Sequence, residues 1–513
     1  MICPTEALYD LFLTHPAVTT DSRRITPGVL FFALRGEHFD GNRFAAAALD
    51  AGAAYAIVDD PAVVSGERFI LVGDVLTALQ QLAAYHRTRL GLPLLAITGT
   101  NGKTTTKELV AAVLSRKFSV EYTRGNLNNH IGVPLTLLSM TSHTEFGVVE
   151  MGANHPGEID FLCRIATPDF GLITNVGKAH LEGFGSFEGV IRTKSELYRY
   201  LEEREGTIFV NGGNPWLTAS AGPLLRKVIY RALESAGHDE TGRKDSAAEK
   251  MDEPMTVRTS ISKVERETNK AVYQGDVGLT GRGAEKEDEV ITVRAAVKEN
   301  SMVTGRAVAR EDALVTGSSV GKGPFLEVQT REDAGTQPIM THLVGNYNLE
   351  NVLAAVAVGR HFGVPADMIR EAIEAYVPSN NRSQWMTAGS CEIIMDAYNA
   401  NPTSMLASVR NFIALDHPLK MVILGDMLEL GEASAEEHQK IVDELALHFR
   451  KGVCLAGNAF ASTQHPPGFI AFPTAAELAG WLREHLPVGA LLLIKGSRGM
   501  QLEKIADLLR DSP

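Results

Sequence analysis

The chain reads LLAITGTNGKTTTKELVAAVL between Leu94 and Leu114. The apolar residues at its start indicate a buried strand, the glycines that follow indicate a tight turn, and the residues from Lys103 onward favour a helix. Glycine lets a backbone approach a ligand closely, and free N–H groups at the start of a helix attract anions. The segment therefore predicts a phosphate-binding loop between a strand and a helix.

The side chains of this loop have the chemistry that a nucleoside triphosphate requires. Lys103 can neutralise the outer phosphates, and Thr104 can offer its hydroxyl to Mg²⁺. The general phosphate-loop pattern also has a glycine six positions before the lysine, where this chain has Ile97. An ordinary turn is the alternative, but the flanking strand and helix favour phosphate binding. The residues predicted to contact the nucleotide are Gly99, Thr100, Asn101, Gly102, Lys103, Thr104 and Thr105.

Length and charge limit the possible classes of protein. A chain of 513 residues exceeds what one hydrophobic core usually serves, so three domains are expected. The 49 basic and 62 acidic residues give a net charge of −13, which argues against a general binder of nucleic acid or anionic membranes. An anionic substrate must therefore meet local positive charge and backbone donors.

The cysteines and the apolar runs indicate where the protein acts. Cys3, Cys163, Cys391 and Cys454 lie far apart and form no Cys-x-x-Cys pair, so neither a disulfide framework nor a zinc cluster is indicated. Reduced thiols and a cytoplasmic location are the simplest interpretation. No long apolar run and no basic-then-apolar N-terminal segment occurs, so we expect neither a membrane span nor an export signal.

The chain divides into three α/β regions. Residues 1–91 form a small first domain, residues 92–376 a central domain with alternating strands and helices, and residues 377–513 a third domain. Alternation of this kind predicts a parallel sheet with binding loops at the strand ends. A polar, β-rich stretch at about 235–338 is atypical, and 237–252 within it reads as an insertion. The main strands are predicted at Leu94–Thr98, Phe146–Glu150, Phe170–Thr174, Val290–Val293, Phe325–Val328, Glu392–Asp396, Lys420–Leu424, Gly452–Leu455 and Leu491–Lys495.

Three polar residues beyond the loop are candidates for metal or substrate chemistry. Glu150 ends a predicted buried strand, where a carboxylate is costly unless it is paired or binds a metal. The alternative is that Glu150 begins a solvated loop. His180 follows a neighbouring strand, although a single histidine there is more often a satisfied loop residue than a ligand. Lys194 lies in a predicted helix, where a lysine by default faces solvent.

Taken in order, these segments resemble the central domain of the Mur ligases, ATP-dependent amide-bond-forming enzymes of peptidoglycan synthesis. The similar segments are GTNGKTT at 99–105, EMG at 150–152, TNVGKAHLE at 174–182 and the helix that carries Lys194. The resemblance implies that Lys103 and Thr104 bind ATP phosphates and Mg²⁺, and that Glu150 and His180 hold magnesium. It also implies that Lys194 is carbamylated, which turns a cation into an anionic group. Lys103, Glu150, His180 and Lys194 are the implied catalytic set.

The resemblance continues beyond the central strands. GNYNLEN at 345–351 is similar to the family's helix start near the adenine, which implies adenine-side roles for Asn346 and Asn351. Arg382 matches an arginine that reaches toward the ATP phosphates, and Asp396 matches the residue that meets the ribose. From the residues alone, Asp396 could instead cap a helix, and Asn399 and Asn401 could form a turn before a proline.

Two further strings indicate a branch of the family. DAYNANPTSM at 396–405 and GDMLELG at 425–431 resemble the ligases that join D-alanyl-D-alanine to UDP-N-acetylmuramoyl-tripeptide. The Asp-Asn-Pro-Arg string of the ligase that adds the preceding residue does not occur. By the same resemblance, Ser22 and Arg23 lie near the nucleotide sugar, and Asn399 and Asp426 lie near the dipeptide.

The resemblance implies a three-domain α/β architecture: a small UDP-substrate domain, a central parallel-sheet ATPase domain with the phosphate loop, and a C-terminal Rossmann-like domain. It covers roughly residues 19–230 and 341–500. ATP and Mg²⁺ are the implied cofactors, and we expect a monomer. The alternatives are another Mur-type or folylpolyglutamate-type ligase, or a nucleotide-gated switch that performs no ligation.

Overall fold

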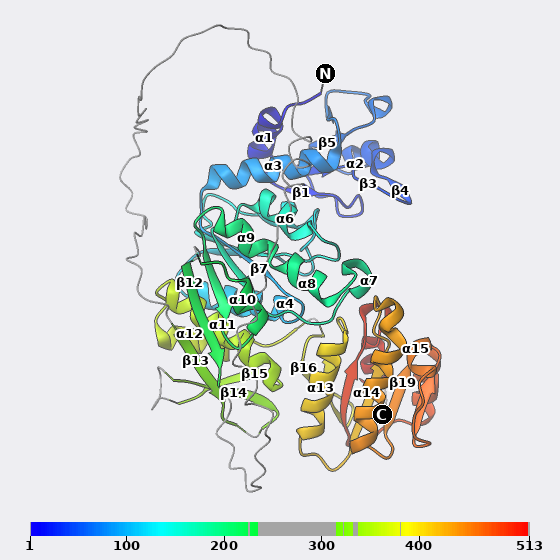
Figure 1. Cartoon of the computed structure of the whole chain (residues 1–513). Helices are drawn as coiled ribbons and strands as arrows, with labels where there is room; N and C mark the ends of the chain where they lie inside the picture. The colour runs from blue at the N-terminus through cyan, green and yellow to red at the C-terminus, as the bar shows by residue number, and fades with distance from the viewer. Residues whose placement is uncertain are drawn as a thin grey trace, which may run out of the picture. The chain divides into compact units, whose positions relative to one another are not determined.

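The computed structural model describes residues 2–223, 226–233, 314–321, 323–331, 337–379 and 381–510. These residues belong to one compact unit. Their strands form sheets of four, nine and six strands and a two-stranded ribbon, with helices between many of the parallel strands (Figure 1). This is the α/β class that the sequence predicts.

The nine-stranded sheet carries the phosphate-binding loop. Its order is β15-β14-β13-β12-β11-β10-β7-β9-β8, parallel from β8 to β13, whereas β14 and β15 pair antiparallel. The strands are β7 (Leu94–Thr98), β8 (Val120–Tyr122), β9 (Phe146–Glu150), β10 (Phe170–Ile173), β11 (Thr207–Asn211), β12 (Arg226–Ala232), β13 (Leu314–Ser319), β14 (Phe325–Thr330) and β15 (Ile339–Val344). The helices are α4 (Lys103–Leu114), α5 (Gly132–Leu138), α6 (Glu158–Ala166), α7 (Leu181–Phe184), α8 (Phe187–Lys194), α9 (Glu196–Glu202), α10 (Pro215–Ser220), α11 (Leu349–His361) and α12 (Ala366–Glu374).

The first four residues of strand β7 are all apolar because both of its faces are covered. Leu95 and Ile97 pack into the same core cluster as residues of α4 and α11, whereas Leu94 and Ala96 join the cluster on the opposite face. Side chains alternate along a strand, so a strand that is buried on both sides reads as a continuous apolar run. This covering fixes the position of the loop between β7 and α4.

The other two large sheets are also mainly parallel. The first has the order β1-β2-β5-β6, and the last has the order β16-β17-β21-β18-β19-β20, in which only β16 pairs antiparallel. The first region contains β1 (Val18–Thr19), β2 (Leu30–Phe32), β5 (Tyr55–Val58), β6 (Phe69–Leu71), the ribbon β3 (Arg35–Gly36) and β4 (Phe39–Asp40), and α1 (Thr5–Thr14), α2 (Ala45–Asp50) and α3 (Val75–Leu90). The last region contains β16 (Gln384–Ala388), β17 (Cys391–Asp396), β18 (Lys420–Gly425), β19 (Val453–Ala456), β20 (Phe469–Phe472), β21 (Leu491–Lys495), α13 (Pro402–Ala414), α14 (Ser434–His448), α15 (Asn458–Ala461), α16 (Ala475–Glu484) and α17 (Glu503–Arg510).

The predicted strands agree closely with those observed. β7, β9 and β21 have the predicted bounds, β10 ends one residue earlier, and the strand expected at Phe325–Val328 lies within β14. The strand expected at 290–293 and the insertion at 237–252 lie outside the described residues. Within the parts of the chain that the structure describes, no helix is long and apolar enough to cross a membrane.

Candidate active site

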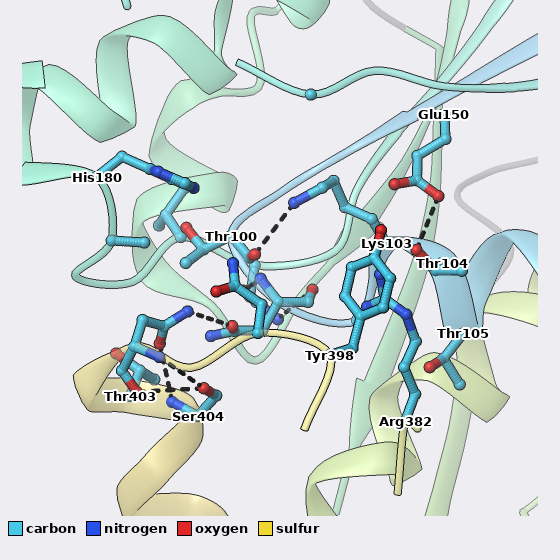
Figure 2. Close-up of a pocket in the computed structure, with 18 of the residues that line it drawn as sticks. Thr100, Lys103, Thr104, Thr105, Glu150, His180, Arg382, Tyr398, Thr403 and Ser404 are labelled. Carbon is cyan, nitrogen blue, oxygen red and sulfur yellow. Dashed lines mark hydrogen bonds between the residues drawn. The ribbon is translucent and has the colours of Figure 1, made fainter. Parts of the chain in front are cut away.

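A cavity of about 1170 Å³ opens at the carboxyl ends of the central strands, where binding loops of a parallel sheet are expected. The loop that follows β17 of the last sheet also lines it (Figure 2), and so does the loop that follows β18. The predicted site residues that line the cavity are Thr100, Asn101, Gly102, Lys103, Thr104, Thr105, Glu150, His180, Asn346, Asn351, Arg382, Asp396 and Asn399. Residues as far apart in the sequence as Thr100 and Asn399 therefore line one cavity.

Two positions of the phosphate loop require glycine, because neighbouring atoms leave no room for a side chain. Gly99 has a φ of 143°, and a Cβ there would lie 2.0 Å from the hydroxyl of Thr174. Gly102 has a φ of 76°, and a Cβ there would lie 2.5 Å from the amide oxygen of Asn351. A side chain at either position would both strain the backbone and displace these contacts.

The loop after β10 forms hydrogen bonds that hold the phosphate-binding loop in place. The backbone N–H of Asn101 donates to Oδ1 of Asn175 at 2.9 Å, and the hydroxyl of Thr174 donates to the carbonyl of Asn101 at 2.6 Å. The backbone N–H of Gly177 donates to the hydroxyl of Thr100 at 3.0 Å. These bonds fix the loop before any ligand binds, which lowers the entropic cost of binding.

Lys103 lies at the start of α4 with its ammonium group turned back over the loop. Its Nζ donates to the carbonyls of Gly99, at 2.7 Å, and Thr100, at 3.1 Å, the second of which Figure 2 shows. Burial lowers the pKa of Lys103 to about 8, although the charge of Glu150 opposes the shift. A buried cation that bonds only to carbonyls can turn toward an anionic ligand, which would offset its desolvation.

Glu150 is buried at the end of β9, with a side chain that is 2% exposed, so it does not begin a solvated loop. Its Oε2 accepts a hydrogen bond from the hydroxyl of Thr104 at 2.9 Å, and its Oε1 accepts one from the amide of Asn128 at 2.8 Å. The structure therefore joins two of the predicted metal ligands. Asn128 was not predicted, although it stands in the polar run GNLNNH at 125–130, which is a usable signal.

A second lysine of α4 is buried beside Glu150. The Nζ of Lys107 is fully buried, lies 3.5 Å from Oε2 of Glu150 and makes no hydrogen bond. Burial is the main cause that lowers its pKa. Lys107 was not among the predicted site residues, since a lysine one turn into a helix normally faces solvent. Two lysines of α4 thus lie close to the one carboxylate of Glu150.

His180 does not share hydrogen bonds with Thr104 and Glu150. Its Nδ1 pairs with the carboxylate of Glu429, from the loop after β18. Burial lowers the pKa of His180, and the charge of Glu429 acts in the opposite direction. Among the described residues, no group of three or more His, Cys, Asp or Glu side chains is arranged to hold a metal.

Lys194 is buried at the end of α8 rather than exposed, so the default expectation for a helical lysine is wrong here. Its Nζ contacts the carbonyl of Ala153 at 3.3 Å and lies 5.3 Å from the centroid of the Phe184 ring. Burial, followed by the charge of Lys103, lowers the pKa of Lys194 to about 7. It does not line the cavity itself, whereas Ala153 does.

The asparagines before and within α11 have different roles. Asn351 is buried, accepts a hydrogen bond from the Thr106 hydroxyl at 3.0 Å and donates to Asn348 at 2.8 Å. It therefore connects α11 to α4 behind the phosphate loop. Asn346 lies at the exposed start of this segment and lines the cavity.

Arg382 is stacked on an aromatic residue that the sequence analysis did not select. Its Cζ lies 3.6 Å from the centroid of the Tyr398 ring, and the two side chains extend together below Lys103 (Figure 2). Its Nε is buried without a hydrogen-bond partner. The neighbours Asn381 and Ser383 have φ values of 56° and 46°, which are strained for residues with side chains. Arg382 is thus held in a defined position with hydrogen-bonding capacity left over.

Asp396 at the end of β17 forms a buried ion pair and does not cap a helix. Its Oδ2 lies 2.5 Å from Nζ of Lys495 and accepts a bond from the Ser408 hydroxyl at 2.9 Å. Burial raises the pKa of Asp396, but Lys495 and the hydrogen bonds outweigh it and lower the pKa overall. The cap of α13 is Asn401, whose amide also donates to Oδ1 of Asn101 at 2.7 Å.

We expect Asp396→Asn to lower the free energy of unfolding by about 3–5 kcal/mol at pH 7, because it leaves the buried Lys495 unpaired. The folded-state pKa of Asp396 is below its unfolded value, so its contribution is present above about pH 4 and is lost as the pH falls further. Urea unfolding at pH 7 and pH 3 measures both effects. Asp507→Asn, which breaks an exposed pair with Arg510, is the control and should cost under about 1 kcal/mol. An equal loss for Asp396→Asn at both pH values would contradict this account.

The remaining predicted residues lie outside the cavity. The carboxylate of Asp426 accepts bonds from the backbone N–H groups of Ala459, at 3.0 Å, and Phe460, at 2.9 Å. It therefore shapes the loop after β18, and its role near the dipeptide stays a prediction. Ser22 and Arg23 follow β1 in the first region, where Arg23 pairs with Asp21 at 2.9 Å.

This site is typical of a nucleotide-dependent enzyme: it has a rigid phosphate loop, a buried carboxylate beside it and an arginine brought in from a second sheet. The sequence comparisons specify the class further. The chain matches the Mur ligase middle domain over residues 97–282, the Mur ligase glutamate ligase domain over 381–498, and the Mur ligase catalytic domain over 16–87. The chain belongs to the Mur ligase family, as its motifs indicated.

Relatives of known name match over nearly the whole chain. The UDP-N-acetylmuramoyl-tripeptide--D-alanyl-D-alanine ligase of Bacillus subtilis is 31% identical, over 98% of this chain and 95% of the relative. The Escherichia coli ligase of the same name is 29% identical, with the same coverage. The crystal structure of MurF from Acinetobacter baumannii superposes with a TM-score of 0.73 at 28% identity, covering 96% of this chain and 93% of that one. The predicted three-domain Mur ligase architecture is therefore confirmed, while its domain boundaries stay predictions.

Proposed function

We propose that the protein joins D-alanyl-D-alanine to UDP-N-acetylmuramoyl-tripeptide, with conversion of ATP to ADP and phosphate. The observation that carries the proposal is the meeting of Lys103, Glu150, Arg382 and Asp396 around one cavity in a chain of this family. The two substrates are those that appear in the shared name of the relatives. A cytoplasmic location and a monomeric state stay predictions.

The reaction needs the tripeptide carboxylate to be activated, because a carboxylate does not react with an amine in water. An oxygen of this carboxylate attacks the γ-phosphorus of ATP, ADP leaves, and an acyl phosphate forms. The amine of the dipeptide then attacks the acyl carbon, loses a proton, and phosphate leaves with the former carboxylate oxygen. Negative charge gathers at the phosphates during the first step, where Lys103 and Arg382 would stabilise it.

The residues present also fit a Mg²⁺ ion at the phosphate end. Thr104 and Glu150 offer a hydroxyl and a carboxylate in direct contact, and Mg²⁺ in nucleotide enzymes takes few protein oxygens together with phosphate oxygens. When bound, the ion neutralises charge on the transferred phosphoryl group. His180 could act as a further ligand through Nε2 while its Nδ1 stays paired with Glu429, since a carboxylate on the other ring nitrogen commonly orients a metal-binding histidine.

The test measures phosphate release from ATP by the purified protein with UDP-N-acetylmuramoyl-tripeptide, with and without D-alanyl-D-alanine. We expect release only with both substrates, and a product whose mass equals that of the UDP-N-acetylmuramoyl-pentapeptide. Turnover that ignores the dipeptide would favour the nucleotide-gated switch. Turnover that only another amino acid supports would favour another Mur-type or a folylpolyglutamate-type ligase.

A further inference from the structure

Arg498 lies in a loop at the carboxyl edge of the last sheet, and other loops at this edge line the cavity. The strands β17, β21 and β18 are neighbours and run parallel, so the loops that follow them leave from the same edge. Tyr398 follows β17, Arg498 follows β21 and Leu428 follows β18. Tyr398 and Leu428 both line the cavity, and Arg498 stands between them in strand order.

Close contacts lock these loops together. The backbone N–H of Leu428 donates to the hydroxyl of Ser497 at 2.9 Å, and the N–H of Ser497 donates to the carbonyl of Asp426 at 3.2 Å. A Cβ on Gly499 would lie 3.1 Å from the Leu428 side chain. The backbone position of Arg498 is therefore set by the packing of its neighbours, while its side chain is exposed.

Two guanidinium groups share the ring of Tyr398. The Cζ of Arg382 lies 3.6 Å from the ring centroid, and that of Arg498 lies 5.3 Å from it. No described carboxylate lies within 4.0 Å of either guanidinium group, and the buried Nε of Arg382 has no hydrogen-bond partner. Two adjacent cations without a counter-charge fit a site that receives two anionic groups.

We propose that Arg498 binds the terminal carboxylate of the acceptor dipeptide, while Arg382 binds the phosphates of ATP. This inference rests on the proposed function. An extended dipeptide spans about 7 Å, and both guanidinium groups lie closer than that to the Tyr398 ring. Arginine matches a carboxylate in a bidentate geometry, and Leu428, 47% exposed, offers an apolar surface to the methyl groups. Arg498 takes the role that Asp426 was predicted to share.

The test compares D-alanyl-D-alanine with its C-terminal amide, which lacks the carboxylate charge. With the unaltered protein, we expect KM for the amide to be about 10- to 100-fold higher than KM for the acid. Arg498→Gln should raise KM for the acid by a similar factor and raise KM for the amide little. KM for ATP and for the tripeptide substrate should not change.

Two control variants separate this role from a general effect. Arg498→Lys keeps the charge without the planar fork, so its KM for the acid should lie between those of the unaltered protein and Arg498→Gln. Arg483→Gln, an exposed position in α16 outside the cavity, should leave every KM unchanged.

Three results would overturn the inference. The first is an equal KM for acid and amide in the unaltered protein. The second is an equal rise in KM for acid and amide in Arg498→Gln, and the third is a rise in KM for ATP in that variant with no rise in KM for the acid. The first comparison needs no variant, so equal use of acid and amide overturns the inference even if Arg498→Gln does not fold. If the unaltered protein shows no dipeptide-dependent turnover at all, the proposed function itself fails, which is a different outcome.

Discussion

Lys103→Met is expected to lower kcat for ATP-dependent ligation by about 10³-fold, with a smaller rise in KM for ATP. The loop backbone and the start of α4 would still receive the phosphates, so some affinity remains. The charge that develops on the transferred phosphoryl group would lose its nearest flexible cation, and removal of one such group typically costs about 10²–10³-fold. Steady-state phosphate release with both substrates measures the effect.

Loss of folding would not explain that result. Lys103 is a buried ammonium whose pKa is lowered to about 8, and an apolar side chain of similar length removes its desolvation cost. The unfolding temperature of Lys103→Met should therefore equal or exceed that of the unaltered protein. Lys117→Met is the matched control, because Lys117 lies after the same helix and bonds to the carbonyls of Phe362 and Gly363, outside the cavity. Unchanged turnover in Lys103→Met would refute the assigned role.

The central sheet could be read from the sequence because its signals are local. A strand buried on both faces is apolar along most of its length, so β7 and β9 were predicted with their observed bounds, although each ends in a polar residue. The glycines at 99 and 102 were expected from the phosphate loop, and their positive φ values agree. In parallel sheets the strand ends meet at one edge, so Glu150 could be placed beside Thr104.

The roles of several charged residues could not be read in this way, because they depend on contacts between distant segments. Lys107 and Lys194 are both helical lysines, and only the packing of other elements around them makes them buried. Asp426 carries a carboxylate in a family motif, yet two backbone N–H groups more than 30 residues later satisfy it. Tyr398 gains its significance from Arg382 and Arg498, which approach its ring from different loops.

We expect ligation to depend on dissolved carbon dioxide through Lys194, with a loss of about 10²-fold when carbon dioxide is removed. Burial lowers the pKa of Lys194 to about 7, so near neutral pH a large fraction of its amine is uncharged and can attack carbon dioxide. The resulting carbamate is anionic and would relieve the repulsion between Lys194 and Lys103. As the pH falls below about 7, the amine gains a proton and the carbamate cannot form.

The measurement is phosphate release in buffer freed of carbon dioxide, before and after addition of bicarbonate, at pH 6 and pH 8. Bicarbonate should restore the activity of the unaltered protein more completely at pH 8 than at pH 6. Lys194→Arg keeps the positive charge but stays protonated, so it should be slow and indifferent to bicarbonate. If the unaltered protein is equally active with and without carbon dioxide, Lys194 acts as a buried cation beside Ala153, and its pKa, which burial and the charge of Lys103 lower, serves no carbamate.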